Sequence, residues 1–166
     1  MIKINENVKT KLKVLVIVLS LFISGVLFFK FFNVPFHETG HMIACKLIGG
    51  NITGYEIIVE RTGEVYGGRI ICEYYGDELK SKILLISGFM FELIIVTILI
   101  SLLPISAIGS AYSFKISYWL LNNAYEHDFS GLGIEYLTIP LSILLFIMGI
   151  IGIILNFYYV NRSIKH

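Results

Sequence analysis

Long apolar stretches alternate along the chain with short polar segments. Residues 14–29 carry no charged side chain, and the wider segment 12–32 reaches the length of about 20 residues that is needed to cross hydrocarbon. Residues 80–103 and 133–161 form two more apolar stretches, each with lysine or arginine at one end. The pattern therefore predicts membrane helices over 12–32, 80–103 and 133–161.

The segments between these stretches are too short or too polar to cross a bilayer alone. Pro35 suits the first turn of a helix over 35–49, which Gly49 and Gly50 would end. Residues 52–75 hold two β-rich runs around a glycine-containing turn, which predicts a β-hairpin. Residues 112–126 predict a short amphipathic or re-entrant helix. We expect a mainly α membrane protein with four to five membrane helices or half-helices, one small hairpin and a single domain over 1–166.

Composition supports lipid as the solvent for this chain. Hydrophobic residues make up 56% of it and charged residues only 15%, whereas soluble domains average about 45–50% and about 25%. The net charge of +1 gives no indication of a nucleic-acid partner. We expect an integral protein of the cell membrane whose immediate surroundings are the lipid bilayer. Nothing in the sequence sets an oligomeric state.

Basic residues predict which way the chain is inserted. Four lysines precede the first apolar stretch, which by the positive-inside rule puts the N-terminus in the cytoplasm: Lys3, Lys9, Lys11 and Lys13. No small-residue cleavage site follows this stretch, so we interpret it as a retained anchor rather than a signal peptide. Arg162 and Lys165 follow the last stretch and favour a cytoplasmic C-terminus as well. Both termini on one side would require an even number of crossings.

The two cysteines give little information on their own. Cys45 and Cys72 are too few for a disulfide framework, and neither belongs to a CxxC pair. Free cysteines are commonly small core residues. We therefore interpret Cys45 as a buried structural thiol.

The segment His37-Glu38-Thr39-Gly40-His41 carries the clearest chemistry in the chain. A helix turns about 100° per residue, so His37 and His41 project from one face and can bind one Zn²⁺. Zinc lowers the pKa of a bound water to about 7, and Glu38 is placed to accept its proton. Ionisable groups between membrane spans are costly unless they are paired or bound to metal, so this motif predicts a zinc site.

A catalytic zinc needs a third protein ligand and one open position. The cluster Glu126-His127-Asp128 lies in a segment that could fold back onto the motif, and we predict Asp128 as the third ligand. His127 and Glu126 remain as alternatives. Other divalent metals also suit two histidines and a carboxylate.

Residues 35–50 resemble the active-site helix of the site-2 protease family of intramembrane zinc metalloproteases. The likeness rests on Pro35-Phe36 before the motif, Met42-Ile43-Ala44 after it, and Gly49-Gly50 before a predicted hairpin. The resemblance implies a zinc endopeptidase that cleaves within or near a transmembrane segment of another membrane protein. It also implies that an aspartate on a later segment, here Asp128, completes the ligand set.

Three further residues are candidates for the cavity or for substrate contact. Glu92 stands where the family has an Asn in a later helix, and Asn122 and Asn123 resemble an Asn upstream of the family's aspartate. A charge at a helix centre costs about 2.5–3.5 kcal/mol on insertion scales. Glu92 therefore either faces a polar cavity or is protonated and hydrogen-bonded to a neighbouring helix.

Two other functions compete with a protease. The chain could bind zinc without catalysis, as a partner or regulatory subunit, although a structural site has no need of a general base such as Glu38. It could instead belong to a transporter or channel in which the motif is accidental. That function would predict repeats or several broken spans, and this sequence is too short to show them.

Overall fold

In the computed structural model, residues 6–59, 65–122 and 125–165 are described. They form five α-helices, two short 3₁₀ turns and one two-stranded antiparallel sheet. In chain order the elements are α1 Glu6–Leu47, β1 Asn51–Val59, β2 Val65–Glu73, α2 Glu78–Ser101, a 3₁₀ turn Leu103–Ile105, α3 Ser106–Leu121, α4 Glu126–Leu132, a 3₁₀ turn Glu135–Leu137 and α5 Thr138–Lys165. The mainly helical class and the hairpin are both confirmed.

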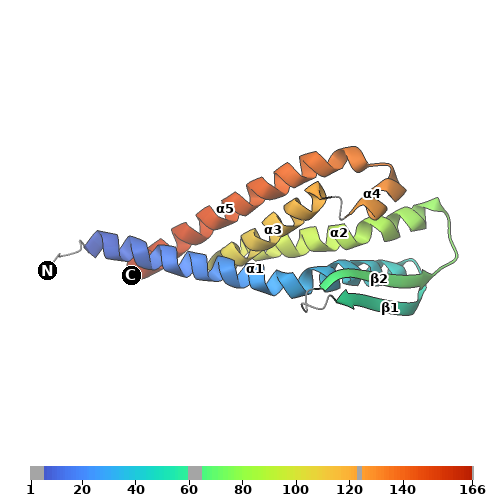
Figure 1. The fold of residues 1–166 in the computed structure, drawn as a ribbon, viewed down its shortest axis with the longest axis horizontal. Helices are drawn as coiled ribbons and strands as arrows, with labels where there is room; N and C mark the ends of the chain where they lie inside the picture. The colour runs from blue at the N-terminus through green and yellow to red at the C-terminus, as the bar shows by residue number, and fades with distance from the viewer. Residues whose placement is uncertain (1–5, 60–64, 123–124, 166) are drawn as a thin grey trace.

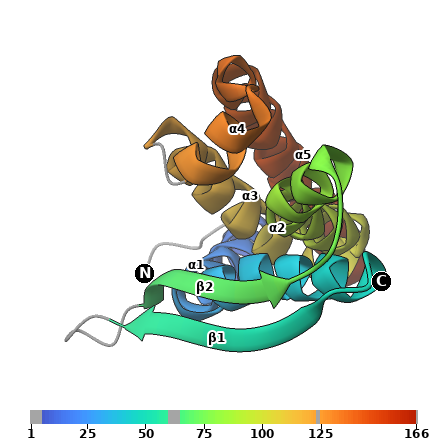
Figure 2. The ribbon, with the colours of Figure 1, turned by 90° about the vertical axis from the view of Figure 1, so that its right-hand side faces the viewer.

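The long helices form an elongated bundle (Figure 1). α1, α2, α3 and α5 run along its length in alternating directions, so both ends of the chain lie at one end of the bundle. The hairpin and α4 lie at the opposite end, and the sheet packs beside the second half of α1 (Figures 1 and 2). Segments far apart in sequence therefore meet at the hairpin end.

Three of the helices are long and apolar enough to cross a membrane: α1, α2 and the segment Glu135–Ile164 that contains α5. Between 22% and 28% of the residues in their most apolar windows are buried inside the protein. Large side chains such as Leu27 on α1, Ile98 on α2 and Ile154 on α5 are more than half exposed. Outward faces this apolar are suited to lipid rather than to water.

α1 corrects the expectation of two separate helices, over 12–32 and 35–49. It continues through Pro35 without a break. Proline has a φ angle that a helix accepts, but it removes one backbone hydrogen bond and crowds the preceding turn. Tertiary packing offsets that cost here, because Asn33 and Val34 are almost completely buried.

The prediction for the other end of the helix is confirmed. Gly49 has a φ of +80°, and the Gly50 N–H donates to the Cys45 carbonyl at 2.8 Å.

α3 begins six residues earlier than the helix predicted over 112–126, and α4 is a separate helix after it. Small residues lead α3 and allow close packing: Gly109 touches the backbone of α2, and Ser110 lies against Gly152 of α5. The segment 106–111 consists mostly of small residues, which give neither a strongly apolar stretch nor a clear helical pattern. α2 and α5 differ from the predicted spans 80–103 and 133–161 only near their ends.

The hairpin carries a second correction. β1 and β2 pair in the register Glu56 with Arg69, and Cys72, near the end of β2, forms a disulfide with Cys45 of α1. Cys45 is therefore not a free thiol. The two cysteines are 27 residues apart, and only the return of β2 past the end of α1 brings their Cα atoms to 6.0 Å. The hairpin is thus covalently fixed to the helix that carries the histidine motif.

Candidate metal site

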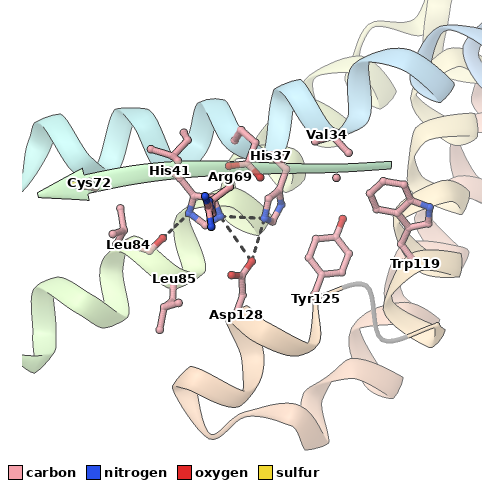
Figure 3. A pocket seen from close by; sticks show the side chains of 14 residues that line it. Val34, His37, His41, Arg69, Cys72, Leu84, Leu85, Trp119, Tyr125 and Asp128 are labelled. Carbon is pink, nitrogen blue, oxygen red and sulfur yellow. Dashed lines mark hydrogen bonds and ion pairs between the residues drawn. The ribbon is translucent and has the colours of Figure 1, made fainter. Parts of the chain in front are cut away.

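His37, His41 and Asp128 converge at the hairpin end of the bundle (Figure 3). The two histidines lie one turn apart on α1, and Asp128 lies on α4, which packs against α2. His37 Nε2 lies 3.0 Å from His41 Nε2 and 3.0 Å from Asp128 Oδ2, and His41 Nε2 lies 3.8 Å from that same oxygen. The three ligand atoms therefore face one common point.

The partners of the ring nitrogens indicate where protons can lie. His41 Nδ1 lies 2.7 Å from the carbonyl oxygen of Leu84, which can only accept, so Nδ1 carries the proton. His37 lies between two carboxylates, with Nδ1 3.3 Å from Glu92 and Nε2 3.0 Å from Asp128, so without a metal both of its ring nitrogens can donate. A cation bound between the two Nε2 atoms would replace any proton there and leave each Nδ1–H paired with its own acceptor.

The spacing fits a metal ion. Zinc binds imidazole nitrogen and carboxylate oxygen at about 2.0–2.2 Å, so tetrahedral ligands are separated by roughly 3.3 Å. The observed separations of 3.0, 3.0 and 3.8 Å bracket that value. His37, His41 and Asp128 can therefore hold a metal ion. Their number, three among the described residues, matches the open sites of zinc enzymes rather than closed structural sites.

Glu38 is next to the first histidine and lines the same cavity. Only 6% of the surface of Glu38 is exposed, because β2 lies directly over it. The two are so close that a Cβ added to Gly68 of β2 would be 2.6 Å from Glu38 Cγ. Tyr55 lies on the neighbouring strand; partial burial raises the pKa of its phenol, and the charge of Glu38 raises that pKa further. Glu38 is thus a shielded carboxyl group beside the three ligands, without being one of them.

Two glycines allow α1 and α2 to approach each other at this site. A Cβ on Gly40 would be 2.4 Å from the carbonyl oxygen of Ser87, and a Cβ on Gly88 would be 2.6 Å from the Nε2 of His37. The Gly88 Cβ would also be 2.7 Å from the Nε2 of His41. Gly88 therefore leaves the room that both imidazoles occupy, and neither glycine was singled out from the sequence for this role.

Glu92 lies behind His37, with no exposed surface, rather than among the residues that line the cavity. Its Oε1 accepts from Asn33 Nδ2 at 3.0 Å and from the Tyr112 hydroxyl at 3.2 Å. Its Oε2 accepts from the Tyr125 hydroxyl at 2.6 Å and faces His37 Nδ1. Glu92 therefore links the candidate ligand to α2 and α3.

The remaining candidates do not join the ligand group. Asn122 is exposed, donates to the Tyr118 carbonyl at 2.7 Å and is not among the residues that line the cavity. Asn123 lies outside the described residues, as do the side chains of Glu126 and His127. Sequence reasoning missed the Leu84 carbonyl, Tyr112 and Tyr125 as contacts of this network, because no local pattern shows which helices will be neighbours.

A cavity of about 570 Å³ opens beside the three ligands. α1 and β2 form one side of it, and residues of α2, α3 and α4 form the other. Gly67, Gly68, Arg69 and Ile70 bring the backbone of β2 to its wall, and Trp119 and Tyr125 lie on the opposite side (Figure 3). The cavity is large enough for water and for several residues of an extended peptide.

Comparisons with protein-family models, with curated proteins and with solved structures found no match to this chain.

Proposed function

We propose that this chain is an intramembrane zinc endopeptidase that cleaves within or near a transmembrane segment of another membrane protein. The observation that carries the proposal is the open group of His37, His41 and Asp128 with Glu38 beside it in one cavity. A metal-binding partner without catalysis would have no use for a second carboxyl group, Glu38, that is not a metal ligand.

The residues of the chain take distinct roles in this proposal. His37, His41 and Asp128 would hold the zinc, which when bound supplies Lewis acidity and lowers the pKa of a coordinated water. Glu38 accepts the proton of the attacking water and later returns it to the leaving amine. Burial under β2 keeps Glu38 away from bulk solvent, which strengthens its electrostatic effect on the reacting groups.

The hairpin offers a way to hold the substrate. A transmembrane helix satisfies its own backbone and must be unwound before a peptide bond becomes accessible. β2 pairs only with β1 among the described residues, and it lies between β1 and the helices (Figure 2). An extended segment could therefore add to β2 by backbone hydrogen bonds along the cavity wall.

The chain's own pattern supports a site near one edge of the bilayer. The predicted membrane segment over 12–32 ends at Phe32, and His37 follows five residues later, which is about 8 Å along a helix. We infer that Lys9, Lys11 and Lys13 lie on the cytoplasmic side of the cell membrane. The hairpin end would then face the opposite side, where oxidising conditions preserve a disulfide such as Cys45–Cys72.

Metal content and cleavage, measured on one set of variants, test the proposal. The detergent-solubilised protein would be assayed for bound metal by elemental analysis, and for cleavage of a library of quenched fluorescent peptides with apolar segments. We expect about one zinc per chain in the wild type and in Glu38→Gln. We expect His41→Ala and Asp128→Ala to lose the metal. Cleavage should fall by at least roughly 10²-fold in Glu38→Gln, as for loss of a general base.

Glu56→Gln is the matched control, because Glu56 is an exposed residue of β1 paired with Arg69. It should keep both metal and cleavage. A wild type that holds no metal after incubation with zinc would overturn the proposal. Metal binding with no cleavage of any peptide, by a fully folded wild type, would favour a non-catalytic metal-binding partner instead.

A further inference from the structure

The carboxylate of Glu92 is the most completely enclosed charged group among the described residues that contact the candidate site. It has no exposed surface although it lies in the middle of an apolar span. A carboxylate has about four acceptor positions, and four donors surround this one: two on Oε1 and two on Oε2. A buried carboxylate is costly unless it is satisfied in this way.

All four of those donors lie outside α2. Asn33 and His37 belong to α1, Tyr112 belongs to α3, and Tyr125 directly precedes α4. Tyr112 stacks on Phe29 of α1 with ring centroids 3.9 Å apart, which fixes its ring. The position of Glu92 is therefore determined by the packing of the bundle and is not free to follow the histidine.

We propose that Glu92 is a positioning residue that accepts a hydrogen bond from His37 Nδ1, keeps the proton on that nitrogen and so leaves Nε2 to bind the metal. The inference rests on the proposed function for its metal, whereas the proton on Nδ1 can be observed without one. Ligating histidines commonly donate their other ring N–H to a carboxylate, and loss of that partner typically costs about 10–100-fold in metal affinity.

The two histidines are held by different kinds of partner. His41 Nδ1 faces the Leu84 carbonyl and the hydroxyl of Ser87, which itself donates to that carbonyl at 2.6 Å. No side-chain substitution removes the carbonyl. His37 depends on a side chain from another helix, so its tautomer can be changed by a single substitution at Glu92.

Glu92→Gln is the decisive variant because it preserves the shape of the side chain. A glutamine offers one oxygen and one NH₂ group to four donors. Its NH₂ group is satisfied on the side of His37 Nδ1 and Tyr125, both of which can accept, and not on the side of Asn33 Nδ2, which can only donate. Facing the NH₂ group, His37 Nδ1 must accept, and Nε2 then carries the proton of the ring. The lone pair needed for the metal is then lost.

Two measurements test this proposal. ¹⁵N NMR of histidine-labelled, metal-free protein should show a protonated Nδ1 on His37 in the wild type and loss of that proton in Glu92→Gln. Competition with a chromophoric chelator should show zinc affinity about 10–100-fold weaker in Glu92→Gln. Glu78→Gln is the matched control, because it makes the same change at an exposed position of the same helix, and it should alter neither quantity.

The outcomes separate this proposal from the protease proposal. If Glu92→Gln leaves His37 Nδ1 protonated and the zinc affinity unchanged, the role of Glu92 is overturned even when the wild type binds zinc and cleaves peptides. If the wild type binds no zinc but carries a proton on His37 Nδ1 that Glu92→Gln removes, the protease proposal fails and the role of Glu92 in orienting His37 stands. If Glu92→Gln does not fold, an unprotonated Nδ1 of His37 in the wild type is sufficient to overturn it.

Discussion

Gly88 shows how a residue without a side chain can determine a metal site. The Cβ of an alanine at this position would lie 2.6 Å from His37 Nε2 and 2.7 Å from His41 Nε2, so both rings must move. Gly88→Ala should therefore abolish or greatly weaken zinc binding, which elemental analysis and chelator competition can measure. Overpacking of this kind also costs about 1–3 kcal/mol of stability.

Gly149→Ala on α5 is the control for overpacking as such. Its Cβ would meet the Phe114 ring at 2.6 Å, away from the candidate ligands. It should lower the thermal unfolding temperature while the protein still binds zinc. Equal zinc affinity in Gly88→Ala and the wild type would show that the metal lies somewhere other than between the two imidazoles.

Single residues also show how far the sequence predicts the site. Spacing alone places His37 and His41 on one helix face, and the predicted third ligand, Asp128, is brought to the same point by the structure. The charge of Glu92 inside an apolar span marks it as unusual. Its partners depend on which helices pack together, and no local pattern contains that information.

At the scale of elements, the differences between the expected and observed helices have a common cause. Pro35 was expected to begin a helix and lies inside one, while the small residues at 106–111, which lie outside every predicted helix, begin α3. Local propensity favours the expected structure in both segments. Packing reverses it, because Asn33, Val34 and most of the first half of α3 are buried against neighbouring helices.

The Cys45–Cys72 disulfide should stabilise the attachment of the hairpin to α1. It closes a loop between residues 27 positions apart, and disulfides of this kind typically contribute about 2–4 kcal/mol. The double variant Cys45→Ser/Cys72→Ser should unfold at a temperature several degrees lower and expose the hairpin to limited proteolysis. Zinc content should stay the same, because neither sulfur belongs to the ligand group.

Reducing agent provides the control for the disulfide. It should lower the unfolding temperature of the wild type toward that of the double variant and have no effect on the variant itself. A wild type in which thiol titration finds both cysteines free after purification under oxidising conditions would contradict the pairing.

At the scale of the whole molecule, the direction of the helices combines with the charge pattern to predict an orientation. α1, α2, α3 and α5 alternate in direction, so the N- and C-termini lie at one end and the candidate site lies toward the other (Figure 1). The basic residues that begin α1 and end α5 therefore lie at the end without the disulfide. Cytoplasmic lysines and an oxidising environment for the cysteines are compatible in a single orientation.

Cysteine labelling in membranes tests this orientation. With Cys45 and Cys72 joined, the wild type has no free thiol, so a single added cysteine reports one position. Tyr75→Cys, between β2 and α2, should react with a membrane-impermeant maleimide in spheroplasts; Arg162→Cys, near the end of α5, should react only after the membrane is opened. Both positions are exposed in the structure. The reverse pattern would place the candidate site on the cytoplasmic side. The reducing environment there would leave Cys45 and Cys72 as thiols. The hairpin would then be held to α1 by packing alone.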